Sequence, residues 1–160
     1  MRTAPDIEIR SATLADHAAL RELLPLLADF DIPPRRDSRH LWEGDAELLE
    51  AVLVGKVATS FVHVAETRGD TPQIIGFVMF SMREEMLSHR PSAHLEAIVV
   101  HPDARGRGMG RQLMLHTETE VRSQGAESLT LHVFSRNQRA RALYEAQGFD
   151  SEVIRAVKWL

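Results

Sequence analysis

A glycine-dense segment with three arginines is the part of this sequence whose residue types point most directly to chemistry. Residues 105–111 are Arg-Gly-Arg-Gly-Met-Gly-Arg, between an apolar run and a segment with helical periodicity. Glycine has no Cβ, so backbone N–H groups in such a turn can converge on a ligand. The free N–H groups at the start of a following helix favour an anion, as does the positive end of its dipole. The segment therefore predicts a site for a phosphate-bearing ligand.

The glycine spacing excludes two other phosphate-binding motifs. A P-loop needs Gly-Lys followed by Ser or Thr, whereas Gly110 is followed by Arg111. The dinucleotide-binding fingerprint needs its third glycine three residues after the second, where this chain again has Arg111. The spacing that fits is Arg-x-x-Gly-x-Gly, met by Arg105, Gly108 and Gly110.

Two blocks around this spacing resemble the GNAT superfamily of N-acetyltransferases. Residues 100–102 (Val-His-Pro) lead into the turn as in that family's acetyl-CoA motif. Asn137, residues 140–145 (Ala-Arg-Ala-Leu-Tyr-Glu) and residues 148–149 (Gly-Phe) resemble its later motif. The resemblance covers almost the whole chain in element order. It implies an acetyl-CoA-dependent N-acetyltransferase in which an amine attacks the thioester directly and CoA is the product.

The resemblance also implies which residues bind the cofactor. In the family, backbone amides of the turn hold the CoA pyrophosphate; the matching positions are Arg105, Gly106, Arg107, Gly108, Met109, Gly110 and Arg111. The edge of the preceding strand holds the pantetheine arm; here it is Ile98, Val99 and Val100. An unpaired strand edge offers N–H and C=O groups to the two amides of that arm. Asn137 matches a family position near the split between the two parallel strands. Arg136 and Arg139 are either contacts for an adenosine phosphate or solvated surface side chains.

Tyr144 is the candidate general acid. It is the only tyrosine in the chain, and the resemblance places it where the family often has a tyrosine beside the leaving thiolate. The alternative is an aromatic ring that packs on the core through the helical stripe it shares with Leu143. Both roles are compatible with one side chain.

Glu96 is the candidate general base, because an amine that is protonated in water must lose a proton before it attacks. It interrupts an apolar strand, and its parity with Ile98 and Val100 places it off the face of Leu95 and Ala97. A carboxylate among apolar neighbours resists ionisation, which favours base chemistry near neutral pH. The alternative is a structural glutamate at a wet, splayed strand.

Eight histidines raise the questions of a second base and of a metal. His132 could serve as the base in place of Glu96. No His-Glu-x-x-His helix or other recognised ligand spacing occurs. His94 and Glu96 on one strand face would supply two ligands, where protein sites usually need three or four. We therefore expect no metal.

The expected elements position these residues around one sheet. Strands are expected at 7–10, 61–66, 74–80, 94–100, 129–134 and 152–159, and helices at 13–28, 45–54, 110–123 and 138–147. Strand, helix and strand in succession require a right-handed crossover and parallel pairing. With the resemblance, this predicts a single α/β (α+β) GNAT domain over residues 1–160, with a mostly antiparallel sheet, one splayed parallel pair and about four helices.

Composition excludes several function classes. The chain has no cysteine, which excludes disulfides and thiolate chemistry. Its net charge of −4 gives no general attraction to nucleic acid or anionic membranes. No apolar run approaches the roughly 20 residues of a membrane span, and the first residues lack a secretory signal. We expect a cytoplasmic protein that acts on a small-molecule or peptide amine. Members of the family often dimerise, so the resemblance also allows a homodimer.

The acceptor itself is not specified by the sequence. The resemblance places the acceptor side at residues 30–42, 83–91 and 153–159. The first segment is basic, which favours an acceptor that carries carboxylate or phosphate. Glu84 and Glu85 in the second favour a polyamine or aminoglycoside instead. A catalytically silent CoA-binding sensor or regulatory module is the alternative function.

Overall fold

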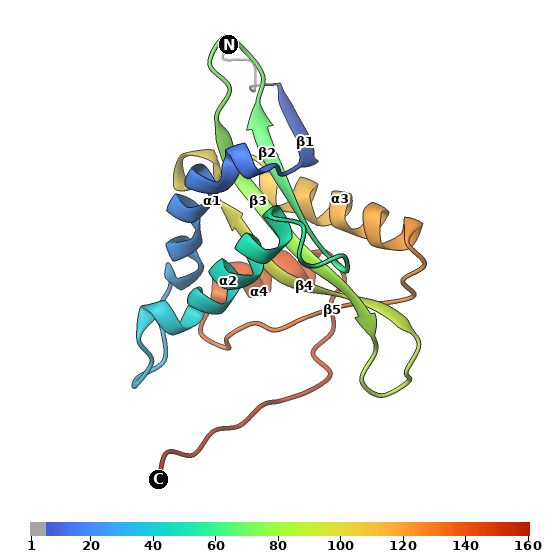
Figure 1. The fold of residues 1–160 in the computed structure, drawn as a ribbon. Coiled ribbons are helices and arrows are strands. Elements are labelled where there is room, and N and C mark those ends of the chain that lie inside the picture. The colour runs from blue at the N-terminus through green and yellow to red at the C-terminus, as the bar shows by residue number, and fades with distance from the viewer. Residues whose placement is uncertain (1–5) are drawn as a thin grey trace.

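A five-stranded sheet with helices on both faces forms the molecule in the computed structural model, which describes residues 6–160 (Figure 1). The strands are β1 (Ile7–Ser11), β2 (Ser60–Thr67), β3 (Ile74–Glu84), β4 (Pro91–Val100) and β5 (Leu129–Leu131), and the helices are α1 (His17–Leu23), α2 (Glu43–Leu53), α3 (Met109–Ser123) and α4 (Gln138–Ala146). The strands follow chain order across the sheet, and every pair is antiparallel except β4 and β5, which are parallel. The predicted fold class is confirmed.

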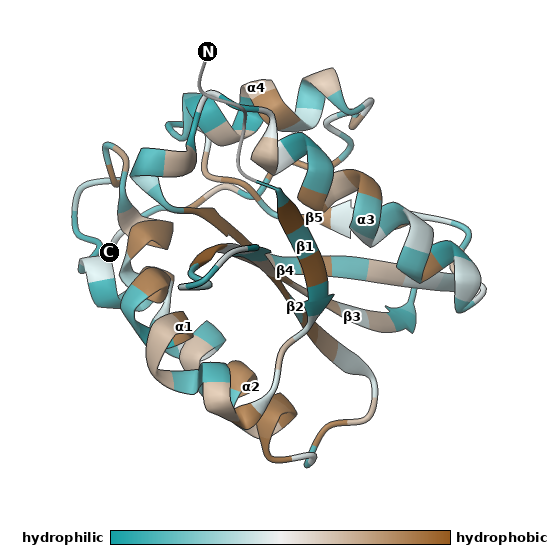
Figure 2. Cartoon of the chain, turned by 90° about the horizontal axis from the view of Figure 1, so that it is seen from above, coloured by the Kyte–Doolittle hydropathy of each residue, from teal (hydrophilic) through white to brown (hydrophobic). Residues whose placement is uncertain are grey.

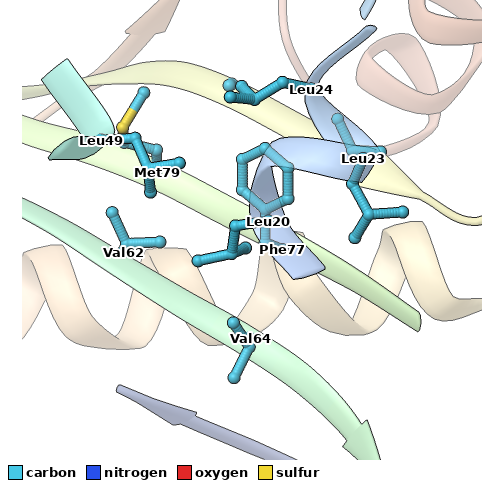
Figure 3. Packing of buried hydrophobic residues seen from close by; sticks show 10 residues of the cluster. Leu20, Leu23, Leu24, Leu49, Val62, Val64, Phe77 and Met79 are labelled. Carbon is cyan, nitrogen blue, oxygen red and sulfur yellow. The ribbon is translucent and has the colours of Figure 1, made fainter. Parts of the chain in front are cut away.

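Two apolar clusters hold the helices to the sheet. On one face, Leu20 of α1 and Leu49 of α2 pack with Phe77 of β3 (Figure 3). On the other face, Leu113 of α3 packs with Phe80 of β3. All five side chains are fully buried, and each such burial stabilises the fold by about 1.5–3 kcal/mol. Figure 2 shows apolar segments along the central strands and alternating hydrophilic and apolar bands on the surrounding helices.

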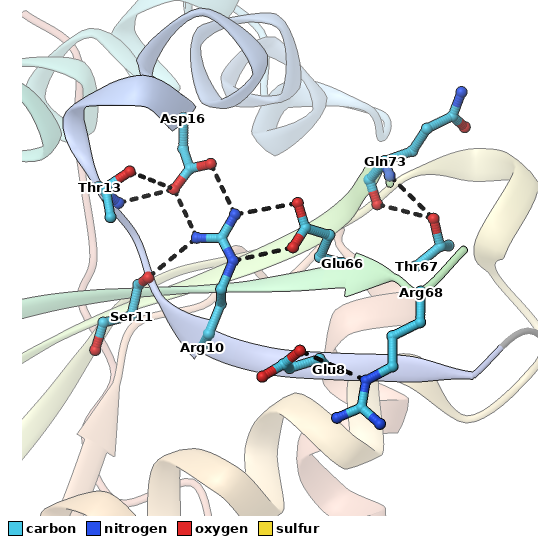
Figure 4. A network of polar contacts seen from close by, with 9 residues as sticks. All are labelled: Glu8, Arg10, Ser11, Thr13, Asp16, Glu66, Thr67, Arg68 and Gln73. Carbon is cyan, nitrogen blue, oxygen red and sulfur yellow. Dashed lines mark hydrogen bonds and ion pairs between the residues drawn. The ribbon is translucent and has the colours of Figure 1, made fainter. Parts of the chain in front are cut away.

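Arg10 joins the first strand to the segment that begins α1. Its guanidinium donates to both carboxylate oxygens of Asp16, at 2.8 and 2.9 Å, and to both of Glu66, at 3.0 and 3.1 Å (Figure 4). Asp16 also accepts from the backbone N–H of Thr13 at 2.7 Å. The hydrogen bond from Arg10 lowers the pKa of Asp16. The network fixes the chain where it leaves β1 and turns over the sheet.

The first predicted helix is shorter than the sequence pattern indicates. α1 ends at Leu23, and 3₁₀ turns cover Leu14–Asp16 before it and Leu24–Ala28 after it. Pro25 has no N–H to donate and its ring crowds the preceding turn, so the α-helical hydrogen bonds cannot continue through it. The remaining three helices begin and end within two residues of their predicted bounds.

The predicted strand at 152–159 is wrong. Residues 150–160 contain no helix or strand and run away from the sheet, exposed along their length (Figure 1). Apolar side chains such as Val153 and Ile154 are exposed there. A strand needs the backbone of a neighbouring strand for its hydrogen bonds, and the sequence pattern alone does not supply that neighbour. Trp159 instead lies under the guanidinium of Arg36, 4.9 Å from its ring centroid.

A β-bulge interrupts β4 at Glu96. Met79 of β3 lies opposite Ala97, whereas the next residue, Phe80, lies opposite Leu95, so Glu96 is one residue more than β3 can pair. The bulge shifts the side-chain alternation of β4 by one position. Leu95 packs in the cluster beneath α3, and Ala97 packs in the cluster beneath α1 and α2. The prediction that these two residues share a face is therefore wrong.

β5 pairs with only the first half of β4. Residues 93–95 lie opposite residues 129–131, where β5 ends, while β4 continues to Val100. The predicted strand at 129–134 is three residues too long, because the chain leaves the sheet after Leu131. Within the described part of the chain, residues 96–100 therefore have β3 on one side and no strand on the other. This is the splayed parallel pair that the resemblance implies.

Within residues 6–160, none of the helices combines the length and the apolar composition that crossing a bilayer requires.

Candidate active site

A cleft of about 460 Å³ lies where β4 and β5 diverge. It is walled by the second half of β4, the turn before α3, the start of α4 and the chain that follows the second 3₁₀ turn. The predicted site residues that line it are Glu96, Ile98, Val99, Val100, Arg105, Gly106, Gly108, Met109, Gly110, Arg111, Asn137 and Tyr144. Arg107 does not line this cleft; its side chain borders a separate cavity beside α1. The fold thus brings together residues from three separate parts of the chain.

The unpaired edge of β4 presents backbone groups to this cleft. His101 N donates to Ile75 O of β3 at 2.8 Å, so hydrogen-bonding groups of the alternate residues Val100 and Ile98 point the other way. Val100 O accepts from Arg105 Nε at 3.0 Å. The N–H and C=O of Ile98 face the cleft, and among residues 6–160 no strand lies opposite them. The edge can therefore pair with an extended ligand that carries amides.

The turn before α3 is built for close approach of a ligand. Gly106 and Gly108 have φ angles of +73° and +77°, in the left-handed region that favours glycine. A Cβ added at either position would meet no described atom of the protein within 4 Å, so the space above the turn is open. The first hydrogen bond of α3 runs from Gln112 N to Gly108 O at 3.0 Å. The amides of Met109 and Gly110 precede that bond and point out of the helix N-terminus, which is the setting that binds phosphate.

Gly110 serves packing rather than conformation. A Cβ at this position would lie 3.1 Å from Leu143 Cδ2 of α4. The absence of a side chain therefore lets α3 and α4 approach each other beside the cleft. Gly110 thus shapes the wall of the cleft, whereas Gly106 and Gly108 shape the turn.

Ion pairs cross the mouth of the cleft. Asp29 pairs with Arg105 at 2.9 Å and with Arg139 at 3.8 Å. Asp31 pairs with Arg136 at 3.2 Å. The arginines considered for an adenosine phosphate are therefore engaged by the chain that follows the second 3₁₀ turn. Of these two arginines, Arg139 lines the cleft, where a phosphate would compete with Asp29.

Glu96 lies on the opposite side of the sheet from the predicted one. Ile98 and Val100 pack against the cluster beneath α3, whereas Glu96 accepts from Arg83 Nη2 at 2.6 Å and lies near Asp45 of α2. The prediction that Glu96 shares a face with Ile98 and Val100 is wrong, because the bulge reverses the alternation after it. The prediction of an apolar environment is also wrong, since an arginine and a second carboxylate surround it.

Asp45 is a cleft residue that the sequence did not reveal. Burial, and then the charge of Glu96, raise the pKa of Asp45 to about 7. A carboxyl group with that pKa changes its protonation state near neutral pH, as a general base should. In the sequence, Asp45 is one acidic residue at the start of a helix, and its distance from Glu96 along the chain hides their proximity.

His132 borders the cleft just beyond the end of β5. Its ring lies edge-on to that of His94, with centroids 4.8 Å apart. His94 Nδ1 and Thr130 Oγ1 are 2.7 Å apart, and burial followed by the charge of Arg83 lowers the pKa of His94 to about 4. His94 is therefore neutral at physiological pH, and His132 is the imidazole that faces the cleft.

Tyr144 combines a packed ring with a place on the cleft wall. Its side chain is buried, and its ring meets Phe149 edge-on with centroids 5.9 Å apart. Among the buried side chains of residues 6–160, no fully buried oxygen or nitrogen lacks a hydrogen-bond partner, so the Tyr144 hydroxyl is not a buried group without a partner. Burial raises the pKa of Tyr144 to about 12, so the hydroxyl keeps its proton at neutral pH and is available as a donor.

Glu84, the last residue of β3, and Glu85, the first residue of the hairpin that follows it, do not line the cleft. Glu84 contacts His89 Nδ1 at 2.6 Å, and Glu85 accepts from the backbone N–H of Ser88 at 2.6 Å. These carboxylates organise the hairpin. The cleft's own acidic groups are Asp29, Asp45 and Glu96.

Comparison with known proteins gives consistent results. The model of the acetyltransferase (GNAT) family matches residues 21–149. The uncharacterized N-acetyltransferase YhfO of Bacillus subtilis is 27% identical over 148 residues, which is 91% of each chain. The ribosomal protein bS18-alanine N-acetyltransferase of Salmonella typhimurium is 43% identical over 63 residues, 39% of this chain and 43% of that protein. A solved structure of aminoglycoside N-acetyltransferase AAC(6')-Iy in complex with CoA is 21% identical, with a TM-score of 0.73 over 100% of this chain and 97% of its own.

Proposed function

Because the chain belongs to the GNAT acetyltransferase family and uses acetyl-CoA to acetylate an amine, we propose that the cleft between β4 and β5 binds both substrates and that the acceptor is a cationic primary amine. Bound acetyl-CoA supplies the activated acetyl thioester. The observation that carries the proposal is the unpaired edge of β4 beside an open glycine turn at a helix N-terminus.

The chain's backbone provides the cofactor contacts in this proposal. Amides of residues 105–111 bind the pyrophosphate. The edge formed by Ile98, Val99 and Val100 pairs with the amides of the pantetheine arm through the Ile98 C=O and the Val100 N–H, which face the cleft. Asn137 Oδ1 accepts from Ala140 N at 3.2 Å and caps α4. Its NH₂ group is then left to donate into the cleft.

Glu96 and Asp45 provide the acidic end of the acceptor site. We assign them jointly to hold the ammonium form of the amine and to remove one proton from it, with Glu96 as the base that the sequence predicts. The charge of Glu96 adds to burial in raising the pKa of Asp45, so the two carboxyl groups are close enough to act on one amine. Arg83 keeps Glu96 in place through the 2.6 Å contact. His132 at the cleft rim is the second candidate base.

Tyr144 is the proposed general acid. Its hydroxyl donates a proton toward the sulfur that leaves the thioester, and the high pKa of the buried phenol keeps that proton in place until it is needed. The N–H of Ile98 is placed to donate to the carbonyl oxygen as negative charge develops there, because it points into the cleft from a rigid strand.

A thiol-release assay with acetyl-CoA tests the proposal. The acceptor panel should contain diamines and aminoglycosides, amines that carry a carboxylate, and peptides with free N-termini. We expect the highest kcat/KM with the cationic acceptors, and a loss of it in Asp45→Asn and Glu96→Gln. Glu84→Gln is the matched control, an acidic residue that lies outside the cleft. CoA binding without thiol release for any acceptor would instead support the sensor function.

A further inference from the structure

A cluster of three potential ligands lies away from the cleft. His63 of β2 and His116 and Glu120 of α3 each place one ligand atom within 4.8 Å of the others. His63 Nδ1 and His116 Nε2 are 2.6 Å apart. Among the residues of the described chain that line the cleft, none belongs to this cluster. It therefore needs an explanation that acetyl transfer does not provide.

The fold assembles this cluster, and the sequence does not show it. His116 and Glu120 are four residues apart on one helix, so they share a face. His63 comes from the second strand, more than fifty residues earlier, and its ring lies 5.5 Å from that of Phe80 on the sheet face that α3 covers. The expectation of no metal depended on spacing within one helix or strand. This set joins two elements.

The contact between the two imidazoles directs a ring nitrogen of each toward the same point, as two ligands of one ion require. In the hydrogen bond between the rings, one nitrogen donates its proton and the other accepts with its lone pair. A cation between the rings would instead be bound by the lone pairs of both nitrogens.

The two imidazole nitrogens lie near the spacing of a tetrahedral zinc site, and the Glu120 carboxylate lies within 4.8 Å of them. Two nitrogens bound to one zinc ion at about 2.0–2.1 Å lie about 3.3 Å apart in tetrahedral geometry, so the two rings must separate by less than about 1 Å. His63 is buried, and His116 and Glu120 are half-buried. The three side chains can therefore shield one side of an ion while the fourth position stays open to water.

We propose that His63, His116 and Glu120 bind a single divalent transition-metal ion, and that Zn²⁺ is the ion whose ligand preference they fit. Two imidazoles and one carboxylate form a donor set typical of zinc. The ion fastens the middle of α3 to β2. Since the N-terminus of α3 forms the pyrophosphate turn, the metal stabilises the helix that carries that turn without touching the reacting atoms.

Zinc titration of the full chain tests the site. The protein is treated with EDTA, desalted and titrated with ZnCl₂ by calorimetry. A parallel titration with CoCl₂ follows the visible absorption of tetrahedral Co²⁺. We expect one equivalent of tight binding, a higher unfolding temperature with Zn²⁺, and loss of binding in acid as the imidazoles take up protons. His116→Gln and Glu120→Gln should each weaken binding by about tenfold or more.

His89→Gln is the matched control, because His89 also contacts a carboxylate but lies on the exposed β3–β4 hairpin. It should bind Zn²⁺ as the wild type does. Circular dichroism checks that each variant folds. If His116→Gln does not fold, the Zn²⁺ binding of Glu120→Gln decides the outcome. The proposal is overturned if the wild type binds no equivalent of Zn²⁺, if both cluster variants bind it as tightly as the wild type, or if the Co²⁺ spectrum is octahedral. The metal readouts are independent of acetyl transfer.

Discussion

Replacing Gly108 with alanine separates the turn's conformational requirement from its contact with the cofactor. Gly108 has φ +77°, and a Cβ there would meet no described protein atom within 4 Å. The substitution should therefore cost only left-handed backbone strain, about 1–2 kcal/mol. In a chain of this size each kcal/mol lowers Tm by about 2–4 °C. The added methyl group would occupy the open space from which a pyrophosphate must approach the amides.

CoA affinity should fall in Gly108→Ala in addition to stability. Keeping one phosphate oxygen from its amide donor forfeits a hydrogen bond to a charged group, about 1.5–3 kcal/mol. This corresponds to about a 10- to 150-fold rise in the Kd for CoA at 1.4 kcal/mol per factor of ten. Isothermal titration calorimetry measures the Kd, and thermal unfolding without ligand measures the strain.

Gly55→Ala is the control for this experiment. Gly55 follows α2 with φ +74°, and no described atom lies within 4 Å of its added Cβ. It should show the same loss of stability and bind CoA as the wild type does. The reasoning is refuted if Gly108→Ala binds CoA normally, or if both variants lose affinity equally. In the first case the pyrophosphate is not held at this turn.

Three further variants test other parts of the structure. In the wild type, kcat/KM for a cationic amine should rise with pH through about 7 as Asp45 ionises, and Asp45→Asn should remove that limb from the pH–rate profile; a persisting limb would point to another group. Tyr144→Phe should lower kcat by about a hundredfold with an unchanged Kd for CoA, because it removes only the proton donor. Single-turnover kinetics measure the rate of acetyl transfer, and a rate equal to that of the wild type would contradict the role of Tyr144. Asp16→Asn should destabilise the fold by about 1–3 kcal/mol at pH 7, since it breaks the contacts with Arg10. The folded-state pKa of Asp16 is lowered below its usual 3.8, so its contribution is present above pH 3.8 and is lost as pH falls through the lowered value. Urea unfolding of wild type and variant should therefore converge in strong acid, and a gap that persists there would contradict this account.

The parts of the structure that local sequence determines were predicted well. The turn at residues 105–111 and the start of α3 follow from glycine conformations and helix-end chemistry, which neighbouring residues fix. The strand β4 follows from its apolar run. Pro25 is also a local signal, and it ends the α-helical hydrogen bonds, although the spacing of the leucines predicts a helix that continues past it.

The parts that depend on tertiary packing could not be predicted. The bulge at Glu96 depends on how β3 pairs with β4, and no residue near Glu96 marks it. The raised pKa of Asp45 depends on where α2 lies over the sheet. The prediction of a strand at 152–159 is wrong for the same reason, because an apolar pattern does not show whether a neighbouring strand is present to pair with it.

The extra residue in β4 has a consequence for how this sequence tolerates length changes. Deleting Glu96 would restore regular pairing with β3, because Leu95 opposite Phe80 and Ala97 opposite Met79 already lie on alternate faces of the sheet. Ile98 would keep its amide toward the cleft, and both apolar clusters would keep their residues. Loss of this one codon would thus remove a carboxylate from the cleft and leave the inside and outside of the strand unchanged, whereas deleting a paired residue of β4 would shift every pair after it.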